Sequence, residues 1–243
     1  NIENALYVFS SILFIFGIKR LSHPKTARSG NFIASMGMLI AIVTTLLANS
    51  NISIELITIG IIIGTIIGAF FAIRVEMTQM PQMVAIFNGF GGIASALIAA
   101  AEFLNPGDIL STFSLATISL SVFVGTLTFT GSFIAFGKLQ GFISGQPIVF
   151  PGQQFLNALI GISILGLAVY ITTAPDQINM FYILIALSAL IGIALTIPIG
   201  GADMPVVISL LNSYSGIAAS STGFVLNNNA LIISGALVGA SGL

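Results

Sequence analysis

The sequence contains no cysteine, and it has a single histidine, His23. A chain without cysteine forms neither a disulfide nor a thiolate metal site, and one histidine among scattered acids is too little for a conventional metal cluster. A nucleophile–base pair and a phosphate-binding glycine motif are also missing. We therefore expect no catalytic, metal-ligating or cofactor-binding residue in this segment.

Charge is scarce as well. Only 5% of the 243 residues are charged, against 56% hydrophobic ones, and the mean hydropathy is +1.12. Because a soluble domain of this size needs charge over much of its surface, these values predict a protein embedded in a lipid bilayer. The net charge of −1 argues against nucleic acid as a partner, since binding to nucleic acid needs a basic surface.

Long apolar runs predict the architecture. About 20 apolar residues in a helix cross a hydrocarbon core of about 30 Å, whereas a transmembrane β-barrel would show alternating segments of about ten residues, which this sequence lacks. We predict an all-α transmembrane bundle with eight complete spans and the start of a ninth near residue 230. The eight spans are expected at residues 4–20, 31–48, 52–73, 81–103, 111–136, 154–173, 177–197 and 203–225.

The basic residues predict the orientation of the bundle. All of them fall in odd-numbered loops: Lys19, Arg20, Lys25 and Arg28 in the first, Arg74 in the third and Lys138 in the fifth. The positive-inside bias places these loops in the cytoplasm, or in the matrix of an organelle, and the N-terminus outside. Because the ninth apolar run stops at Leu243, too short to span, we expect a longer protein that continues on the cytoplasmic side.

An internal repeat relates residues 80–95 to residues 204–219 at a constant offset of 124. Each copy has a proline in the first turn of its helix, where the missing N–H costs little. Each also carries an asparagine, Asn88 or Asn212, about 10 Å further along the helix. An amide in lipid is costly unless it serves packing or transport, and the sequence leaves both explanations open.

Polar stripes follow one face of three predicted helices. Their members are Ser209, Asn212, Ser213, Gly216 and Ser220 within 203–225; Ser114, Thr117, Ser121, Gly125, Thr128 and Ser132 within 111–136; and Asn88, Gly91, Gly92 and Ser95 within 81–103. Such faces can line a hydrated path that contains no charge. Alternatively, the hydroxyls bond to their own helices and the glycines permit close packing.

Glycines spaced by four residues occur in two further helices. The groups are Gly60, Gly64 and Gly68 within 52–73, and Gly235 and Gly239 in the ninth helix. This spacing favours close helix–helix packing. For the Gly235/Gly239 pair, a close contact that can move is the alternative.

Two carboxylates precede the repeated helices. Asp203 has the position of an N-cap, where its side chain would bind free N–H groups at the positive end of the helix dipole. It also lies at the inner mouth of the helix that carries Asn212, where a proton or a cytoplasmic partner would arrive. Glu76 occupies the related approach to the helix that carries Asn88, with the same two interpretations open.

Four segments together resemble one protein family. They are VEMTQMPQMVAIFNGFGG (75–92), TFTGSFIAFGKLQG (128–141), IGGADMPVVISLLNSYSG (199–216) and SGALVGASG (234–242). The chain is similar, over essentially its whole length, to the membrane domain of the beta subunit of proton-translocating NAD(P) transhydrogenases.

This resemblance implies a function. Residues 1–243 are expected to be a proton-translocating membrane domain that couples proton movement down the proton-motive force to hydride transfer from NADH to NADP⁺. The implied partners are alpha-subunit transmembrane helices with their NAD(H)-binding domain, an NADP(H)-binding domain beyond residue 243, and a second copy of the whole unit. The implied location is the bacterial inner membrane, or the inner mitochondrial membrane.

The resemblance also assigns residues. Asn212 and Asp203 match polar positions of the proton path and of coupling to the NADP(H) domain, and Ser132 lies in a TFTGS motif of the same path. Ser209 and Ser213 share the polar face of Asn212. The positions expected to transmit conformational change to the soluble domain are Asp203, Glu76, Arg74, Gly235, Gly239 and Gly242.

One departure from the family concerns Asn88. Many members have histidine here, as the expected protonatable group in mid-membrane, and an amide cannot carry a proton at physiological pH. Either a partner helix supplies the histidine, which we favour, or a chain of water molecules suffices.

Two other classes of function remain open from the sequence. The internal repeat and the polar faces also fit a free-standing secondary transporter of a small solute. A purely structural anchor for soluble domains is the third alternative, against which the two asparagines at matching depth count mildly.

Overall fold

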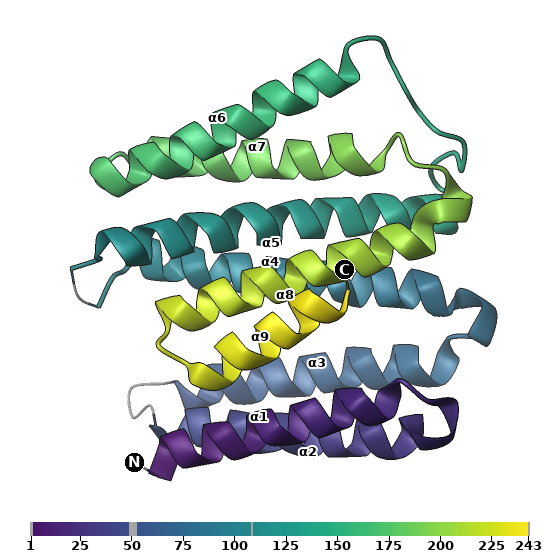
Figure 1. Ribbon diagram of the computed structural model, residues 1–243, viewed down its shortest axis with the longest axis vertical. Coiled ribbons are helices and arrows are strands. Elements are labelled where there is room, and N and C mark those ends of the chain that lie inside the picture. The colour runs from purple at the N-terminus through teal and green to yellow at the C-terminus, as the bar shows by residue number, and fades with distance from the viewer. Residues whose placement is uncertain (1, 49–52, 108, 243) are drawn as a thin grey trace. The chain divides into compact units, whose positions relative to one another are not determined.

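The computed structural model describes residues 2–48, 53–107 and 109–242, and within these ranges it contains helices and loops but no strand (Figure 1). The prediction of an all-α fold is therefore confirmed for the described residues. The chain divides into two compact units, Asn1–Met77 and Thr78–Leu243, which we describe separately.

The first unit contains α1 (Ile2–Leu21), α2 (Pro24–Ala48) and α3 (Ile54–Arg74). Helices α1 and α2 form a tight hairpin because glycines meet where they cross: a Cβ atom on Gly30 would stand 2.8 Å from the carbonyl oxygen of Gly17. Elsewhere along the hairpin, the buried Ser10 hydroxyl donates to the carbonyl oxygen of Gly37 on α2 at 2.6 Å. The hairpin is thus held by backbone contact and by a hydrogen bond between the helices.

Helix α2 begins at Pro24, seven residues before the predicted start at residue 31. Proline suits the first turn of a helix, and the exposed side chains of Lys25 and Arg28 can point away from the helix into water. The apolar run marks where the hydrocarbon begins, not where the helix begins. The basic residues that we expected in the first loop therefore lie on the last turn of α1 and the first turns of α2.

Six helices make up the second unit. They are α4 (Met80–Leu104), α5 (Thr112–Leu139), α6 (Gln153–Thr173), α7 (Ile178–Thr196), α8 (Met204–Val225) and α9 (Asn229–Ser241). Helix α5 is central and contacts α4, α6, α7 and α8, while α9 packs against α8 (Figure 1). Of the candidate spans, α5 has the largest buried share, so its side chains decide how the neighbouring helices fit together.

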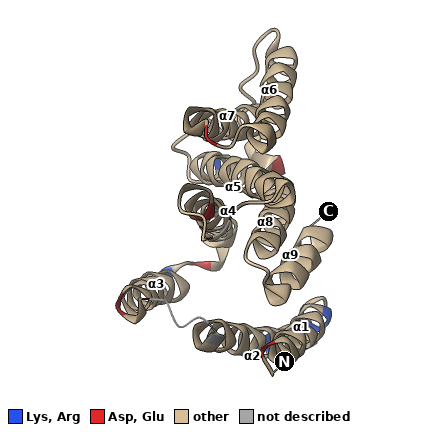
Figure 2. Cartoon of the chain, turned by 90° about the vertical axis from the view of Figure 1, so that its left-hand side faces the viewer, with Lys and Arg blue, Asp and Glu red and all other residues tan. Residues whose placement is uncertain are grey.

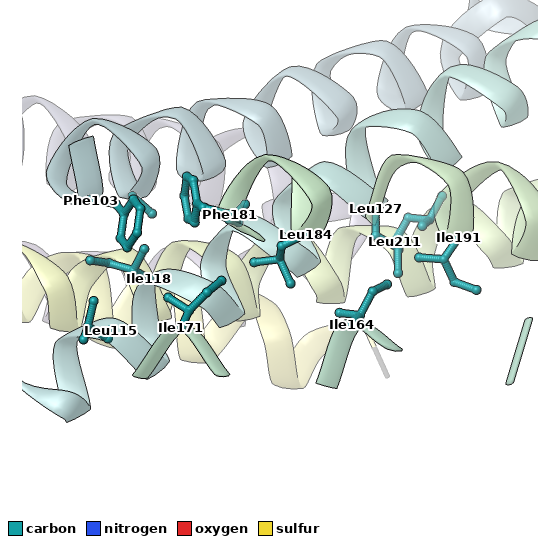
Figure 3. Packing of buried hydrophobic residues seen from close by; sticks show 12 residues of the cluster. Phe103, Leu115, Ile118, Leu127, Ile164, Ile171, Phe181, Leu184, Ile191 and Leu211 are labelled. Atoms are coloured by element: carbon teal, nitrogen blue, oxygen red, sulfur yellow. The ribbon is translucent and has the colours of Figure 1, made fainter. Parts of the chain in front are cut away.

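Apolar side chains of α4 to α8 form the main core of this unit (Figure 3). At one end of the core the rings of Phe103 and Phe181 stack with their centroids 4.0 Å apart and an interplanar angle of 17°. Ile118, Ile164 and Leu184 are fully buried between the helices. This core positions α5 between α4 on one side and α6 and α7 on the other.

Seven of the described helices are long and apolar enough to cross a membrane: α1 to α7. Helix α8 has 22 residues, but its serines and Asn212 make it less apolar, and α9 has only 13 residues. A multi-pass membrane bundle is thus supported, while the count of eight spans stays a prediction. In Figure 2 most of the ribbon is tan, and the blue and red stretches that mark Lys, Arg, Asp and Glu are short and scattered.

The internal repeat extends to the secondary structure. The 3₁₀ turns Met77–Gln79 and Gly201–Asp203, which lead into α4 and α8, are related by the same offset of 124 residues. Helices α3 and α7 also begin at equivalent positions, Ile54 and Ile178. The repeated unit is therefore a helix, a 3₁₀ turn and a second helix.

The glycines of the two helices that open these repeats are packed differently. On α7, a Cβ atom at Gly192 would collide with Leu127 and Thr130 of α5. On α3, no atom of the first unit lies within 4 Å of a Cβ placed at Gly60, Gly64 or Gly68. The close packing predicted for these three glycines is not found within their own unit.

Helices α4 and α5 approach each other more closely than side chains would allow. A Cβ atom at Gly125 would stand 2.5 Å from the carbonyl oxygen of Gly92, and one at Gly92 would stand 2.8 Å from that of Gly125. The backbones are therefore in direct contact, and polar groups on both sides of the contact come within hydrogen-bonding distance.

A single added methyl group tests this contact. Gly125→Ala is expected to lower the free energy of unfolding by about 1–3 kcal/mol, because overpacking must push α4 and α5 apart. The measurement is thermal unfolding of the complete protein in detergent.

Gly166→Ala, on α6, is the matched control, since a Cβ atom there meets nothing within 4 Å. It should leave the melting temperature unchanged or raise it slightly, because alanine favours a helix over glycine by about 1 kcal/mol. Equal melting temperatures for the two variants would show that the close contact is not required.

Candidate functional site

Asn88 is the centre of a buried polar layer that joins α4, α5 and α8. Its Nδ2 donates to Ser132 Oγ at 3.0 Å, and its Oδ1 accepts from Ser215 Oγ at 2.8 Å. Asn88 is 8% exposed and Ser132 is fully buried. Because its oxygen and one N–H are paired with hydroxyls of two other helices, the orientation of the amide is fixed.

A second polar layer lies about 10 Å further along α4. The hydroxyls of Ser121 on α5 and Thr222 on α8 are 2.7 Å apart, and both contact the carbonyl oxygen of Ser95 on α4, at 3.3 and 3.2 Å. Ser121 and Thr222 are both fully buried. The contact between Gly92 and Gly125 lies between the two layers along both helices.

The polar stripe predicted on α5 therefore divides into two kinds of residue. Ser121 and Ser132 bond across to neighbouring helices, as a polar path or polar packing requires. Thr117 and Thr128 instead donate to carbonyls of their own helix, at 3.0 and 2.7 Å, which is the packing interpretation of the stripe.

Two sets of predicted residues meet in one interface between α8 and α9. The Ser213 hydroxyl donates to the carbonyl oxygen of Gly239, and the Ser209 hydroxyl donates to that of Gly242 at 3.2 Å. A Cβ atom at Gly235 would collide with the backbone of Ser220 on α8. The serines assigned to the proton path and the glycines assigned to coupling are thus direct neighbours.

Asn212 differs from its repeat counterpart Asn88. It is half-buried on α8, and within the described part of the chain its side-chain amide forms no hydrogen bond. The structure therefore brings Asn88 and Ser132 together but leaves Asn212 outside that cluster, with its polar group available.

Asp203 is the last residue of the 3₁₀ turn before α8, and it is exposed. It occupies the N-cap position, but its side chain forms no capping hydrogen bond, so of the two interpretations left open the capping one is not observed. Arg74 and Glu76 are exposed residues of the first unit, at and just after the end of α3, where the Arg74 guanidinium lies 5.6 Å from the ring centroid of Phe70.

Lys138 holds the connection between α7 and the turn that carries Asp203 by hydrogen bonds. Its Nζ donates to the carbonyl oxygens of Gln146, Ile197 and Ile199 at 3.1, 2.6 and 2.8 Å, and only 4% of the residue is exposed. Ile197 is the C-cap of α7, and a cation is favourable at that negative end of the helix dipole. The residue that we expected in a loop is a buried clamp on the last turn of α5.

The clamped loop, residues 140–152, is shaped by two glycines with positive φ, Gly141 at +80° and Gly152 at +83°. The Gly201 amide donates to the carbonyl oxygen of Gly145 at 2.8 Å, so the loop also binds the turn that carries Asp203. Lys138 and these contacts together fix the position of the start of α8.

The sequence did not identify three members of this arrangement: Ser215, Thr222 and Lys138. Ser215 has a glycine at its repeat counterpart, so the repeat marks it only as a near match and does not single out its hydroxyl. Among the described residues, no group of three metal-ligating side chains comes together. What the site offers is hydroxyl and amide groups that can pass hydrogen bonds between helices, without a titratable group in either polar layer.

The α8–α9 interface predicts unequal effects of two similar substitutions. Gly235→Ala should lower the melting temperature of the complete protein and weaken any coupling through α9, because its Cβ would collide with the α8 backbone. Gly239→Ala is the matched control, since its Cβ would stand 3.5 Å from the nearest atom, in ordinary contact. A larger loss of stability in Gly239→Ala would contradict the packing described here.

Replacing Lys138 tests the clamp. Lys138→Met removes the ammonium group that joins the carbonyl oxygens of Gln146, Ile197 and Ile199, at a cost of about 1–3 kcal/mol. Hydrogen exchange of the amides in residues 141–152 and 197–203 should accelerate about tenfold or more. Gln140→Met, an exposed neighbour, should leave exchange unchanged, and equal exchange in both variants would exclude the clamp.

Comparisons with known proteins identify the family to which the chain belongs. A family model described as "NAD(P) transhydrogenase beta subunit" matches residues 3–243. Two curated relatives from Rhodospirillum rubrum, both named "NAD(P) transhydrogenase subunit beta", are 47% identical over 249 residues, which cover 100% of this chain and 53% of each relative. The chain spans about half the length of these relatives. It belongs to the NAD(P) transhydrogenase beta subunit family.

Proposed function

We propose that this chain is the membrane domain of a proton-translocating NAD(P) transhydrogenase. In that enzyme it would couple proton movement down the proton-motive force to hydride transfer from NADH to NADP⁺. The observation that carries the proposal is the buried layer in which Asn88 bonds to Ser132 and Ser215. Family membership favours this function over a free-standing transporter of a small solute.

The layer suits a proton path because it holds hydrogen-bonding groups deep between three helices without a charge. An asparagine and two hydroxyls offer both donors and acceptors, so a water or a titrating group beside them would find partners. A purely structural contact between α4 and α8 would not need an amide there, since apolar or small residues pack well in lipid.

The titrating group is proposed to come from a partner. An amide does not protonate at physiological pH, and neither polar layer contains a histidine or carboxylate. We infer that a transmembrane helix of the alpha subunit brings a histidine to this layer. Asn212 lies outside the layer but about one turn from Ser215 on α8, and it is a suitable contact for a histidine that approaches the layer, because its amide has no partner among the described residues.

Coupling is proposed to run through α8 and α9. Protonation that moved α8 would disturb the bonds from Ser213 to Gly239 and from Ser209 to Gly242. The same movement would be felt at Asp203, whose turn is tied to the loop that Lys138 holds. The soluble NADP(H)-binding domain is proposed to contact Asp203 in the second unit and, as a separate contact, Arg74 and Glu76 in the first unit. The soluble NAD(H)-binding domain is proposed to lie on the alpha side.

The proposed assembly places the bundle in a bacterial inner membrane or an inner mitochondrial membrane. All six basic residues lie at connections that the positive-inside bias puts in the cytoplasm or matrix, and the N-terminus would be outside. A dimer of complete units would be the working enzyme.

Ser132→Ala in the complete enzyme tests the proton path. Losing one buried hydrogen bond that the rate-limiting step uses costs about 1–3 kcal/mol, so proton uptake into reconstituted vesicles should fall about fivefold or more. NADP(H) binding to the soluble domain, measured in parallel, should remain, because the change lies within the membrane.

Ser163→Ala is the matched control. Ser163 is an exposed serine of α6 whose hydroxyl bonds to its own helix at 2.9 Å, so proton uptake should be that of the wild-type enzyme. Unchanged uptake in Ser132→Ala would sink the proposed path. Equal losses in both variants would mean that the assay reports general damage to the bundle.

A further inference from the structure

A cleft of about 590 Å³ opens along the α1–α2 hairpin, in the part of the first unit that carries most of the basic residues. Three basic side chains, those of Lys19, Arg20 and His23, line it together with the apolar side chains of Leu13, Phe16 and Ile33. Every one of these residues belongs to the hairpin. None of them takes part in the polar layers or in the α8–α9 interface.

The lining changes from apolar to basic along one face of α1. Leu13, Phe16 and Lys19 are spaced by three residues, so they follow each other along one side of the helix over about 9 Å. Leu13 is half-buried, while Phe16 is 54% exposed beside the charges. The apolar part of the cleft therefore suits an alkyl chain, and the adjoining basic part suits an anion.

The backbone that carries these side chains is well fixed. The Thr26 hydroxyl donates to the carbonyl oxygen of Arg20 at 2.7 Å, and the Thr26 amide donates to that of His23 at 3.0 Å. The Ser22 hydroxyl donates to the carbonyl oxygen of Lys19 at 2.8 Å. With the glycine contact between α1 and α2, these bonds set the spacing of the three basic residues before any ligand arrives.

The positive charge of the cleft has no counter-ion among the described residues. Lys19, Arg20 and His23 form no ion pair with a described carboxylate, and the acidic residue of α1, Glu3, lies in the first turn of the helix, about 24 Å away. An anion at the cleft would thus meet attraction without a competing carboxylate from the same hairpin.

We propose that this cleft binds an anionic phospholipid. The phosphate of the headgroup binds Lys19, Arg20 and His23, and an acyl chain lies along Leu13, Phe16 and Ile33. The order of the groups matches a lipid in the bilayer, because the basic residues end a 20-residue apolar helix, where headgroups lie. A free phosphate would use only the basic half of the cleft.

The experiment uses the complete enzyme in phosphatidylcholine vesicles that contain spin-labelled phosphatidylglycerol or spin-labelled phosphatidylcholine. The protein-bound fraction of each label gives its relative association constant. In the wild-type enzyme phosphatidylglycerol should be preferred. Lys19→Gln combined with Arg20→Gln should reduce that preference about thirtyfold, since each basic residue near the surface contributes about 1 kcal/mol.

The matched control is Lys25→Gln combined with Arg28→Gln, which removes the same charge from exposed positions of the same hairpin outside the lining. It should keep most of the preference. Phe16→Ala should weaken binding about tenfold through lost apolar contact, whereas Phe32→Ala, an exposed phenylalanine outside the cleft, should not.

Three results would overturn the proposal. They are a wild-type enzyme without preference for phosphatidylglycerol, equal losses in the two double variants, and displacement of the labelled lipid by inorganic phosphate. The second would mean a diffuse surface charge, and the third a phosphate site. Unchanged melting temperatures of the variants exclude unfolding as the cause.

Discussion

Polar atoms between α4, α5 and α8 have to find their partners inside the protein, because lipid offers them none. The contact between Gly92 and Gly125 makes this possible. It brings two backbones together, so that one carbonyl oxygen, that of Ser95, contacts the hydroxyls of both Ser121 and Thr222. Larger residues at the glycines would separate the helices, and the buried hydroxyls would then lose the acceptors that make their burial tolerable.

The same constraint distinguishes the two sides of α5. Facing α4 and α8, the buried hydroxyls of Ser121, Thr128 and Ser132 all take part in hydrogen bonds. Elsewhere on the helix, the buried oxygens of Ser119 and Thr126 have no partner among the described residues. Thr126 lies one turn from Thr130, which donates to Ala189 on α7 at 2.9 Å. The α4 and α8 side of this helix thus has a partner for each of these buried hydroxyls, whereas on the rest of the helix Thr130 is paired and Ser119 and Thr126 are not.

The sequence was sufficient to predict the helices, because apolar length and glycine or proline breaks are local properties. It also picked out Asn88 and Ser132 singly, one through the repeat and the other through a stripe. It could not show that they touch, since that depends on how closely α4 and α5 approach each other. Ser215 was only a near match of the repeat, because Gly91, which has no hydroxyl, stands at its repeat position.

Lys138 was beyond prediction for a different reason. A lysine at the end of an apolar run indicates the membrane surface, whether its ammonium group is solvated or buried. Its three acceptors come from two other segments, the loop at Gln146 and the end of α7 at Ile197 and Ile199. A sequence pattern does not reveal a site that assembles from three separate segments. The error at the start of α2 has a simpler cause, because that helix begins before the apolar run from which its start was predicted.

The asparagines of the two repeat copies differ in their hydrogen bonding, and this difference bears on how protonation could be coupled to movement of α8. Asn88 is held by two hydroxyls, whereas Asn212, at the equivalent position of α8, is not held by any described residue. The helix with the unpaired amide is also the one whose serines bind the carbonyls of Gly239 and Gly242. If a partner's titrating group binds Asn212, its change of charge acts directly on α8, and α9 must respond because their glycines leave no space between the backbones. Helix α4, whose Asn88 is held by two hydroxyls, would then stay in place while α8, which carries Asn212, moves relative to it.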